Sequence, residues 1–275
     1  MPVESEISDL NSQLPDPRQR YKMTVAYDGT AFHGWQKQHQ PPAPESDETD
    51  PVILRTVAGV VEGTLQRALG QPINLVGASR TDTGVHAMGQ VAHFNADSKI
   101  PDQRMAQAIN SRLPDDIEVI DVQPIHAEFD AIRDCVSKQY RYSIFNTDRR
   151  PLTLRHSVYH FWKSLDIDRM NAAAARIVGE HNFEGFSAAG HGRSSTIRTV
   201  LNCRVESDEP QVYIVVEGTG FLYNMVRIIT GTLIEVGRGH FEPDAIDQIL
   251  QTADRRHAGP TAPPQGLCLE WIKYK

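Results

Sequence analysis

The sequence predicts an α+β fold in which helices pack against an antiparallel sheet. Some segments alternate apolar and polar residues, which is typical of half-buried strands, and others space apolar residues three and four positions apart, which is typical of helices. Both halves of the 275-residue chain run through the same succession of strand, helix, strands, helix and strand. Sequence similarity between the halves is too weak to prove a duplication, so the prediction depends on the order of the elements.

The first half opens with residues 1–19, a polar segment that we expect to be disordered. A Pro-rich, acidic stretch over residues 38–50 predicts a flexible loop before the first helix. Gly70 and Pro101 suit the end of that helix and the first turn of the next one. The expected strands cover residues 21–27, about 73–78, about 89–96 and about 117–122, and the expected helices follow Val57–Ala68 and Pro101–Ile109.

The second half repeats this alternation of strands and helices. Gly179 is well placed to end a helix over residues 167–177, and Pro243 starts another short helix. A third helix is expected to bury one apolar face, formed by Leu222, Met225, Ile229, Leu233 and Val236. The expected strands cover Tyr140–Ile144, about 196–206, about 211–217 and Leu267–Trp271.

Composition places the chain among ordinary globular proteins, with 40% hydrophobic and 23% charged residues. A chain of this length forms one large domain or two small ones. No apolar run approaches the length of a membrane span, and the polar N-terminal segment lacks the apolar core of a signal peptide. Cys135, Cys203 and Cys268 are odd in number and far apart, which argues against a disulfide framework and a zinc motif. We therefore expect a cytoplasmic protein.

The net charge of −7 does not by itself indicate nucleic-acid binding. Phosphate binding requires only a local basic surface, however, and such a surface can exist on an acidic protein. The segment 133–155 holds six basic residues against two acids, which favours either a phosphate-binding face or a merely solvated one. The basic residues are Arg133, Lys138, Arg141, Arg149, Arg150 and Arg155.

The stretch Gly77–Ala87 places a single carboxylate among groups that can bond it or make room for it. Arg80 offers a charge to Asp82, and the neighbouring threonines and glycine offer hydroxyls and a backbone turn. A loop that follows a strand is a common place for a reactive side chain. Two alternatives are a structural turn capped by Asp82 and the Asp-Thr-Gly signature of an aspartic protease. Such proteases need two facing carboxylates, and no second Asp-Thr-Gly or Asp-Ser-Gly occurs in the sequence.

The run Arg80–His86 resembles the catalytic loop of tRNA pseudouridine synthases of the TruA family, which reads R-T-D-x-G-V-H. In that family the aspartate is the essential catalytic residue, so the resemblance implies this role for Asp82. The similarity extends from about Tyr27 to Tyr274, nearly the whole folded chain. Ser79 stands where many members have glycine, a small change that we expect to be harmless.

Two further blocks support the resemblance in the first half and the middle of the chain. Residues 27–36 are similar to the N-terminal block of the family, in which Phe32 and Trp35 are better explained as core residues than as RNA-stacking residues. The block from Phe129 to Tyr142 places the family's active-site tyrosine at Tyr140. Without that block, a cross-strand aromatic residue would be the simpler explanation of Tyr140.

The last two blocks lie near the end of the chain. Residues 218–227 match a block that ends in Arg227, and a guanidinium in an otherwise buried helix needs an anion as its partner. Asp82 is the natural partner, and the family pattern pairs the two. Residues 261–267 match the final block, where a leucine packs against the target base. That role would fall on Leu267, with ordinary core packing as the alternative.

The resemblance implies two related α/β subdomains, residues 20–128 and 129–275, which share a continuous antiparallel central sheet with a basic cleft. It implies conversion of uridine to pseudouridine in the anticodon stem-loop of tRNA, at tRNA positions 38–40, by a homodimer. No metal or other cofactor is implied, because the reaction rearranges the atoms of one nucleotide. Asp82, Tyr140 and Arg227 would be catalytic, and the substrate-binding residues would be Arg80, Lys138, Arg141 and Leu267, with Arg149 and Arg150 as further phosphate ligands.

Three rival interpretations remain at this point. A pseudouridine synthase of the same fold could act on another RNA site. A non-catalytic RNA-binding relative would keep a basic cleft but lose Asp82 or Tyr140, and both residues are present. A uracil glycosidase would release free uracil, which separates it from an isomerase.

Overall fold

The computed structural model describes residues 18–40, 52–188 and 195–275. Most of the predicted disordered segment 1–19 and of the predicted flexible loop 38–50 lies outside these residues. Gln19 is an exception, because it already begins strand β1 (Gln19–Tyr27). Two short strands, β2 (His39–Gln40) and β3 (Val52–Ile53), pair with each other at the borders of the second gap.

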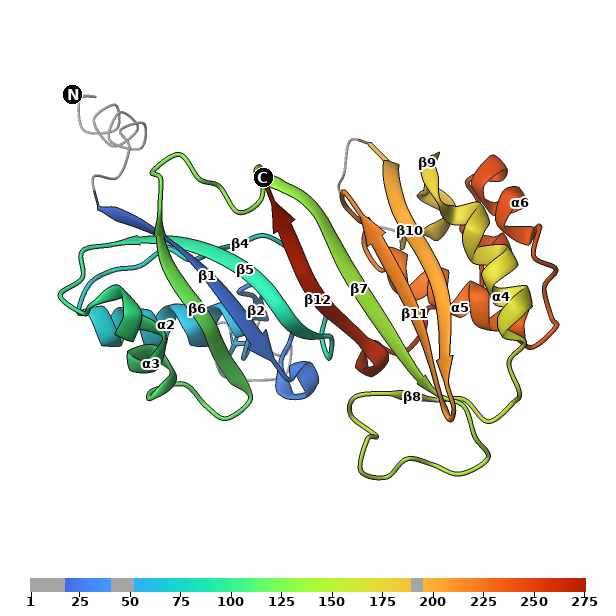
Figure 1. Ribbon diagram of the computed structural model, residues 1–275, viewed down its shortest axis with the longest axis horizontal. Helices are drawn as coiled ribbons and strands as arrows, with labels where there is room; N and C mark the ends of the chain where they lie inside the picture. Colours follow the sequence, from blue (N-terminus) through green and yellow to red (C-terminus); the bar gives the residue numbers. More distant parts are fainter. Residues whose placement is uncertain (1–17, 41–51, 189–194) are drawn as a thin grey trace.

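Ten strands form one sheet, in the order β6–β1–β5–β12–β7–β11–β10–β9, with β4 beside β5 and β8 beside β7 (Figure 1). The α+β class predicted from the sequence is therefore confirmed. The strands besides β1 are β4 (Val76–Gly77), β5 (His86–Ala96), β6 (Ile117–Ile125), β7 (Cys135–Phe145), β8 (Tyr159–His160), β9 (Gly179–Asn182), β10 (Ile197–Asp208), β11 (Gln211–Gly218) and β12 (Leu267–Tyr274).

Most strand pairs are antiparallel, as expected, but the sheet also contains two parallel pairs. Strand β12 runs antiparallel to β7 but parallel to β5, with Cys268 opposite His86 and Leu269 opposite Ala87. Strand β8 also runs parallel to β7. Because parallel strands begin at the same end of a sheet, the loop that leads into β5 and the segment that leads into β12 lie together. This pairing brings distant parts of the sequence to one place.

Five α-helices of the described residues accompany the sheet, with α2 and α3 beside strands β6, β1 and β5, and α4, α5 and α6 beside β11, β10 and β9 (Figure 1). None of the helices in the described ranges is long and apolar enough to cross a membrane. Their bounds are α2 (Val57–Leu69), α3 (Asp102–Asn110), α4 (Ile167–Ala174), α5 (Met225–Gly237) and α6 (Ala245–Thr252).

Local signals set several helix ends as predicted. Gly70 adopts φ +65° at the end of α2, a left-handed conformation that glycine adopts without steric cost, and Pro101 directly precedes α3. The helix expected over residues 167–177 is shorter, because α4 ends at Ala174 and a 3₁₀ turn follows. The strand expected at about 73–78 is reduced to the two residues of β4.

The larger of two hydrophobic clusters in the described residues runs along the sheet and joins both groups of helices. Met23 and Val25 alternate with half-buried neighbours on β1 and pack in the same cluster as Leu65 of α2 and Met105 of α3. In this sheet, β6, β1, β5 and β4 lie on one side of β12, and β7, β8, β11, β10 and β9 lie on the other. The division into subdomains 20–128 and 129–275 and the basic cleft stay predictions.

Helix α5 is buried on all sides and not along one face alone, and Arg227 is its only residue that is not fully buried. Residues Gly259–Pro264, which we call the crossing segment, pass over α5 and contact its residues Arg227, Gly231 and Thr232. A Cβ atom on Gly231 would lie 1.7 Å from the carbonyl oxygen of Pro260, so only glycine permits this approach. The crossing segment leads directly into β12.

Candidate active site

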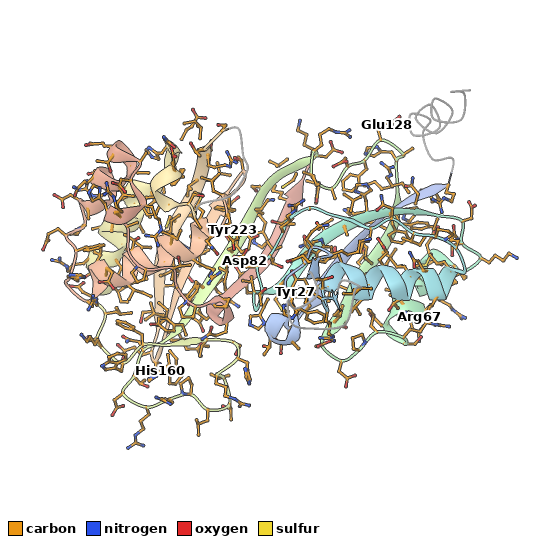
Figure 2. All side chains as sticks on the ribbon, turned by 180° about the vertical axis from the view of Figure 1, so that it is seen from behind. Tyr27, Arg67, Asp82, Glu128, His160 and Tyr223 are labelled. Carbon is orange, nitrogen blue, oxygen red and sulfur yellow. The ribbon has the colours of Figure 1, made fainter. Side chains whose placement is uncertain are left out.

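Asp82 lies near the middle of the molecule, between the helix α2 and the helices of the second half (Figure 2). It belongs to residues 78–85, the Asp82 loop, which joins β4 to β5. The Asp82 carbonyl accepts a hydrogen bond from the Val85 amide at 3.1 Å, and Gly84 adopts φ +78° in the turn that results. The Asp82 side chain is 26% exposed, so it is reachable from solvent.

Residues 27–36, the N-terminal block of the family resemblance, hold the Asp82 loop in place through Thr81. The hydroxyls of Tyr27 and Thr81 lie 2.7 Å apart in a buried hydrogen bond, and the Trp35 amide donates to the Thr81 carbonyl at 3.1 Å. Gly34 adopts φ +80°, and a Cβ atom there would lie 2.4 Å from that same carbonyl. Trp35 and Phe32 are each 1% exposed, which confirms their prediction as core residues.

The predicted contact between Asp82 and Arg227 is present. A terminal nitrogen of Arg227, Nη1, lies 3.2 Å from Oδ2 of Asp82, and the Arg227 side chain is 15% exposed. The same nitrogen donates to Oδ1 of Asn224 at 2.7 Å, and Nε donates to the Ala262 carbonyl at 2.8 Å. The guanidinium is therefore held by Asn224, just before α5, and by Ala262 of the crossing segment. In this position it can also donate a hydrogen bond to the Asp82 carboxylate.

Burial and the neighbouring cation act on Asp82 in opposite directions. Burial raises the pKa of the Asp82 carboxyl above its usual value, and the charge and hydrogen bond of Arg227 lower the pKa by less than burial raises it. The expected pairing with Arg227 therefore accounts for only part of the electrostatic environment of Asp82. A carboxylate that is poorly solvated and still accessible is suited to nucleophilic or basic chemistry.

Tyr140 lies on β7 and is 6% exposed. Its ring packs edge-on against Phe221 with centroids 5.4 Å apart, and its hydroxyl lies 3.0 Å from Oγ of Ser79 in the Asp82 loop. Burial raises the pKa of Tyr140 to about 12. Tyr140 lies opposite Leu269 and Val216 on the neighbouring strands, as a cross-strand aromatic residue does. Its hydroxyl also reaches the Asp82 loop, so the same residue can pack in the sheet and take part in the site.

The predicted substrate-binding residues do not all meet at Asp82. Lys138 shares the Tyr140 face of β7, and its Nζ lies 3.4 Å from both Oγ of Ser79 and the Ala78 carbonyl oxygen. Arg141 lies on the opposite face, where its Nε is 3.1 Å from Oε1 of Glu270 and its guanidinium is 5.3 Å from the Tyr213 ring centroid. Strand alternation thus separates Arg141 from Asp82.

The remaining predicted residues differ in exposure. Arg80 is exposed on the Asp82 loop, and Arg149 and Arg150 are exposed in the segment between β7 and β8. Leu267 is 5% exposed and lies opposite Tyr142 at the start of β12. The packing of Leu267 is that of a core residue in this structure.

Three features of the site were missed by sequence reasoning. Asn224 adopts φ +60° just before α5, a left-handed conformation that is costly for most residues but tolerated by asparagine. Ser79 contacts Tyr140 through its hydroxyl, a contact that the expectation of a harmless small-residue change did not include. The crossing segment contacts both sides of the site, because Ala262 holds Arg227 and Pro264 would lie 3.1 Å from a Cβ atom on Gly84. The sequence signal for Asn224 was its place directly before a helix.

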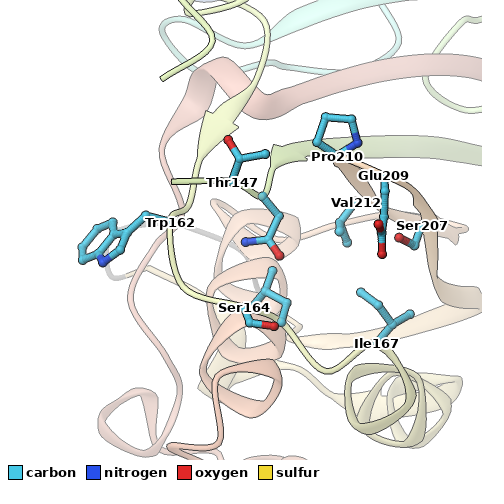
Figure 3. Close-up of a pocket in the computed structure, with 10 residues that line it drawn as sticks. Thr147, Trp162, Ser164, Ile167, Ser207, Glu209, Pro210 and Val212 are labelled. Carbon is cyan, nitrogen blue, oxygen red and sulfur yellow. The ribbon is translucent and has the colours of Figure 1, made fainter. Parts of the chain in front are cut away.

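A separate pocket of about 540 Å³ lies in the second half of the chain (Figure 3). It contains none of the predicted catalytic or substrate-binding residues. Its lining residues are Asn146, Thr147, Trp162, Ser164, Leu165, Ile167, Ser207, Glu209, Pro210 and Val212.

Comparison with known families agrees with this geometry. Residues 23–132 and 173–275 match the model of a family described as tRNA pseudouridine synthase. The chain therefore belongs to the tRNA pseudouridine synthases, a family of isomerases. Both matched parts contain site residues, Asp82 in the first and Arg227 and Leu267 in the second, whereas Tyr140 lies between them.

Individual relatives are similar over nearly their whole length. A protein of Thermoanaerobacter sp. (strain X514) named tRNA pseudouridine synthase A is 42% identical over 92% of this chain and 98% of the relative. A protein of the same name from Acetivibrio thermocellus is 40% identical with the same coverage. A Clostridium perfringens protein named tRNA pseudouridine synthase A 2 is 38% identical, again over 92% of this chain.

Proposed function

We propose that this chain converts uridine to pseudouridine in the anticodon stem-loop of tRNA, with Asp82 as the reacting carboxylate. The observation that carries the proposal is the meeting of a carboxylate, a guanidinium and a phenol from three distant segments. Asp82 contacts Arg227 directly at 3.2 Å, and the Asp82 loop contacts Tyr140 through Ser79 at 3.0 Å. The names of the relatives supply the substrate, tRNA.

The reaction breaks the glycosidic C–N bond, turns the uracil and forms a C–C bond. All atoms of the nucleotide are conserved, so the reaction itself requires no electron acceptor or donor. A uridine within a helical stem must leave the stack to reach Asp82, which costs a few kcal/mol. Contacts between basic side chains and phosphates offset this cost, and Arg80, Lys138, Arg149 and Arg150 are the proposed ligands.

Asp82 acts in this scheme either as a nucleophile or as the base that begins elimination at the sugar. Arg227 stabilises the ionised form of the carboxylate and limits its orientation. Leu267 packs against the target base once the base has entered the site. Arg141, which is paired with Glu270 on the other sheet face, contributes to phosphate binding only if the RNA reaches that face.

Tyr140 stacks on the uracil and removes the proton from C5 at the end of the reaction. In that step the C5–H bond breaks and the phenolate oxygen of Tyr140 takes the proton. The electron pair of the broken bond forms the C5–C6 double bond, the π pair of the N1–C6 double bond returns to N1, and N1 takes a proton from water. The phenol must first release its own proton to water. Because burial raises the pKa of Tyr140 to about 12, the phenolate is scarce near neutral pH and becomes more abundant as the pH rises.

The experiment that tests the proposal uses tRNA carrying tritium at C5 of its uridines. The purified protein should release tritium and produce pseudouridine at anticodon-arm positions, and Asp82→Asn should abolish release while tRNA binding survives. Tritium release near the wild-type rate from Asp82→Asn would contradict the role of Asp82. Free uracil among the products would identify a glycosidase, and modification confined to another arm would contradict the proposed position.

We also propose that the protein acts in the cytoplasm as a homodimer. The dimer would hold the tRNA body on one subunit and present the anticodon arm to the other, because a chain with net charge −7 offers little further basic surface. Light scattering combined with turnover at nanomolar protein tests this point. A monomer that stays fully active under those conditions contradicts it.

A further inference from the structure

Ser79 lies at the junction of three parts of the site. Its Oγ atom is 3.0 Å from the Tyr140 hydroxyl and 3.4 Å from Nζ of Lys138. An ammonium group only donates hydrogen bonds, so Lys138 donates to Ser79 Oγ. The serine hydroxyl remains able to donate its own proton to the Tyr140 oxygen. The three side chains thus form a hydrogen-bonded chain from an ammonium group to the phenol.

The backbone of Ser79 is fixed by a second buried side chain. Gln90 on β5 is 0% exposed, its Nε2 donates to the Ser79 carbonyl at 2.6 Å, and its Oε1 accepts from the Ser79 amide at 3.3 Å. Both backbone groups of Ser79 are therefore bound by one amide side chain, as they would be by a neighbouring strand. This arrangement limits the positions that the Ser79 hydroxyl can adopt.

Tyr140 has no other hydrogen-bond partner for its hydroxyl among the residues that the structure describes. Contact with Phe221 holds the ring but leaves the O–H bond free to rotate. A proton acceptor must direct a lone pair at the proton it takes, and a displacement of about 1 Å can reduce a rate by a factor of about 100. The direction of the phenol oxygen therefore depends on Ser79.

We propose that Ser79, supported by Lys138 and Gln90, is a positioning residue that directs the Tyr140 oxygen toward C5 of the target base. The proposal rests on the function proposed above for Tyr140. Ser79 touches neither the base nor the sugar in this scheme and acts only through Tyr140. When the phenolate forms, the Ser79 hydroxyl donates to it and stabilises it, and the ammonium of Lys138 strengthens that donation.

Two consequences separate positioning from simple structural support. The Ser79 hydrogen bond lowers the pKa of Tyr140, so its loss raises that pKa further. The increase of the reaction rate with rising pH then shifts to higher pH. Proton removal from C5 also becomes slower relative to the other steps, which increases the kinetic isotope effect of deuterium at C5. A fault in folding alone produces neither change.

The experiment compares wild type, Ser79→Ala and Ser79→Gly in single turnover on tRNA with hydrogen or deuterium at C5, between pH 6 and pH 10. We expect both variants to react about tenfold more slowly, with unchanged tRNA binding, a larger isotope effect and a rise in rate at higher pH. Ser79→Thr, which keeps a hydroxyl, should recover most of the rate. Ser111→Ala, which removes an exposed hydroxyl at the end of α3, is the control and should match wild type.

The outcomes distinguish this proposal from the function on which it depends. Wild-type rates, isotope effects and pH dependence in Ser79→Ala would overturn the positioning role and leave the proposed function intact. A slower Ser79→Ala with unchanged isotope effect and pH dependence would also overturn it, because the serine would then be structural. A wild-type protein that forms no pseudouridine would overturn both.

Discussion

A single carboxylate, Asp82, has to be ionised in a place that disfavours its charge. Burial raises the pKa of Asp82, and Arg227 offsets only part of that effect. The reactive, ionised fraction therefore falls as the pH decreases through a pKa above the usual value of about 3.9. Removal of Arg227 leaves burial unopposed and raises this pKa further. By lowering the pKa of Asp82, the Arg227 guanidinium keeps the carboxylate ionised down to a lower pH.

The first prediction follows from this balance. The single-turnover rate, measured from pH 4 to pH 8, should fall on the acid side with a midpoint above the usual pKa of an aspartate carboxyl. Arg227→Leu should be slower and should move that midpoint to higher pH, because the cation that lowers the pKa of Asp82 is lost. Lys22→Ala, distant in the sheet, should leave the midpoint unchanged. An acid limb at the same pH in Arg227→Leu and wild type would contradict the proposed electrostatic coupling.

The second prediction concerns Asn224, whose amide holds Arg227 at 2.7 Å. Asn224→Gly keeps the left-handed backbone, where φ is +60°, and removes only the amide. We expect about a tenfold lower single-turnover rate with little change in melting temperature, because a hydrogen bond to a charged group contributes about 1.5–3 kcal/mol.

A matched control is available for Asn224→Gly. Ala253 follows α6 with φ +53°, so Ala253→Gly relieves a similar backbone conformation far in sequence from Asp82 and Arg227. This variant should be at least as stable as wild type and fully active. Equal activity in Asn224→Gly and Ala253→Gly would show that the amide of Asn224 is unimportant.

Sequence reasoning at this scale succeeded where a motif fixed the residue type. Asp82 and Arg227 were expected to pair, and they do. Arg141 lies on the opposite face of β7 from Tyr140, as the two-residue period of a strand already indicates, and its role in substrate binding stays a prediction. The contact of the Ser79 hydroxyl could not be found, since it arises only in the assembled structure, and the place of Asn224 directly before a helix did not by itself indicate its left-handed φ.

At the scale of elements, the site depends on how closely the crossing segment approaches α5. Gly231 permits that approach, and the segment then places the Ala262 carbonyl on Arg227. The third prediction is that Gly231→Ala pushes the segment away and destabilises the protein by about 1–3 kcal/mol. It should also lower activity in the folded protein, because Arg227 loses its anchor. Thermal unfolding and single-turnover rates measured below the melting temperature check both effects.

Gly63 in α2 provides the control for Gly231→Ala. A Cβ atom on Gly63 would lie 3.4 Å from the end of the flexible Arg67 side chain, so alanine fits there. Gly63→Ala should therefore be neutral or stabilise the protein by up to about 1 kcal/mol, since alanine is the better helix former. Equal stability of the two alanine variants would contradict the close approach at Gly231.

Several helix ends could be predicted from the sequence, whereas the pairing of distant strands could not. Gly70 and Pro101 act within a few residues, so the ends that they set could be predicted. Ile73 and Leu75 are buried without joining the ladder, and hydrophobicity alone made them resemble a strand. The parallel pairing of β12 with β5 joins residues almost two hundred positions apart and has no local signal.

At the scale of the whole molecule, both the protein, with a net charge of −7, and the proposed tRNA substrate are negatively charged. Arg149 and Arg150 are exposed and have no ion pair within the described residues, and Arg80 is exposed beside Asp82. The fourth prediction is a steep salt dependence of tRNA binding. If six to ten phosphate contacts form, affinity should fall by a factor of about 10³–10⁵ between about 50 and 200 mM salt. Filter binding or fluorescence anisotropy measures this slope.

Variants test which basic residues produce the slope. Replacing Arg149 and Arg150 together by alanine should reduce the slope of log affinity against log salt by about 1 for each lost contact. Arg256 is exposed but pairs with Asp254, so Arg256→Ala should leave the slope unchanged. A flat salt response in wild type would mean that these basic residues are merely solvated.

Strand β12 lies at the centre of the sheet although it comes after every other strand in the described sequence. During synthesis on the ribosome, the segments that carry Asp82, Tyr140 and Arg227 all emerge before the strand that aligns them. A chain that stops short of Leu267 carries these three residues without their central strand. Removal of β12 from the C-terminal side should therefore abolish activity completely. Nascent chains that still lack β12 should not modify RNA.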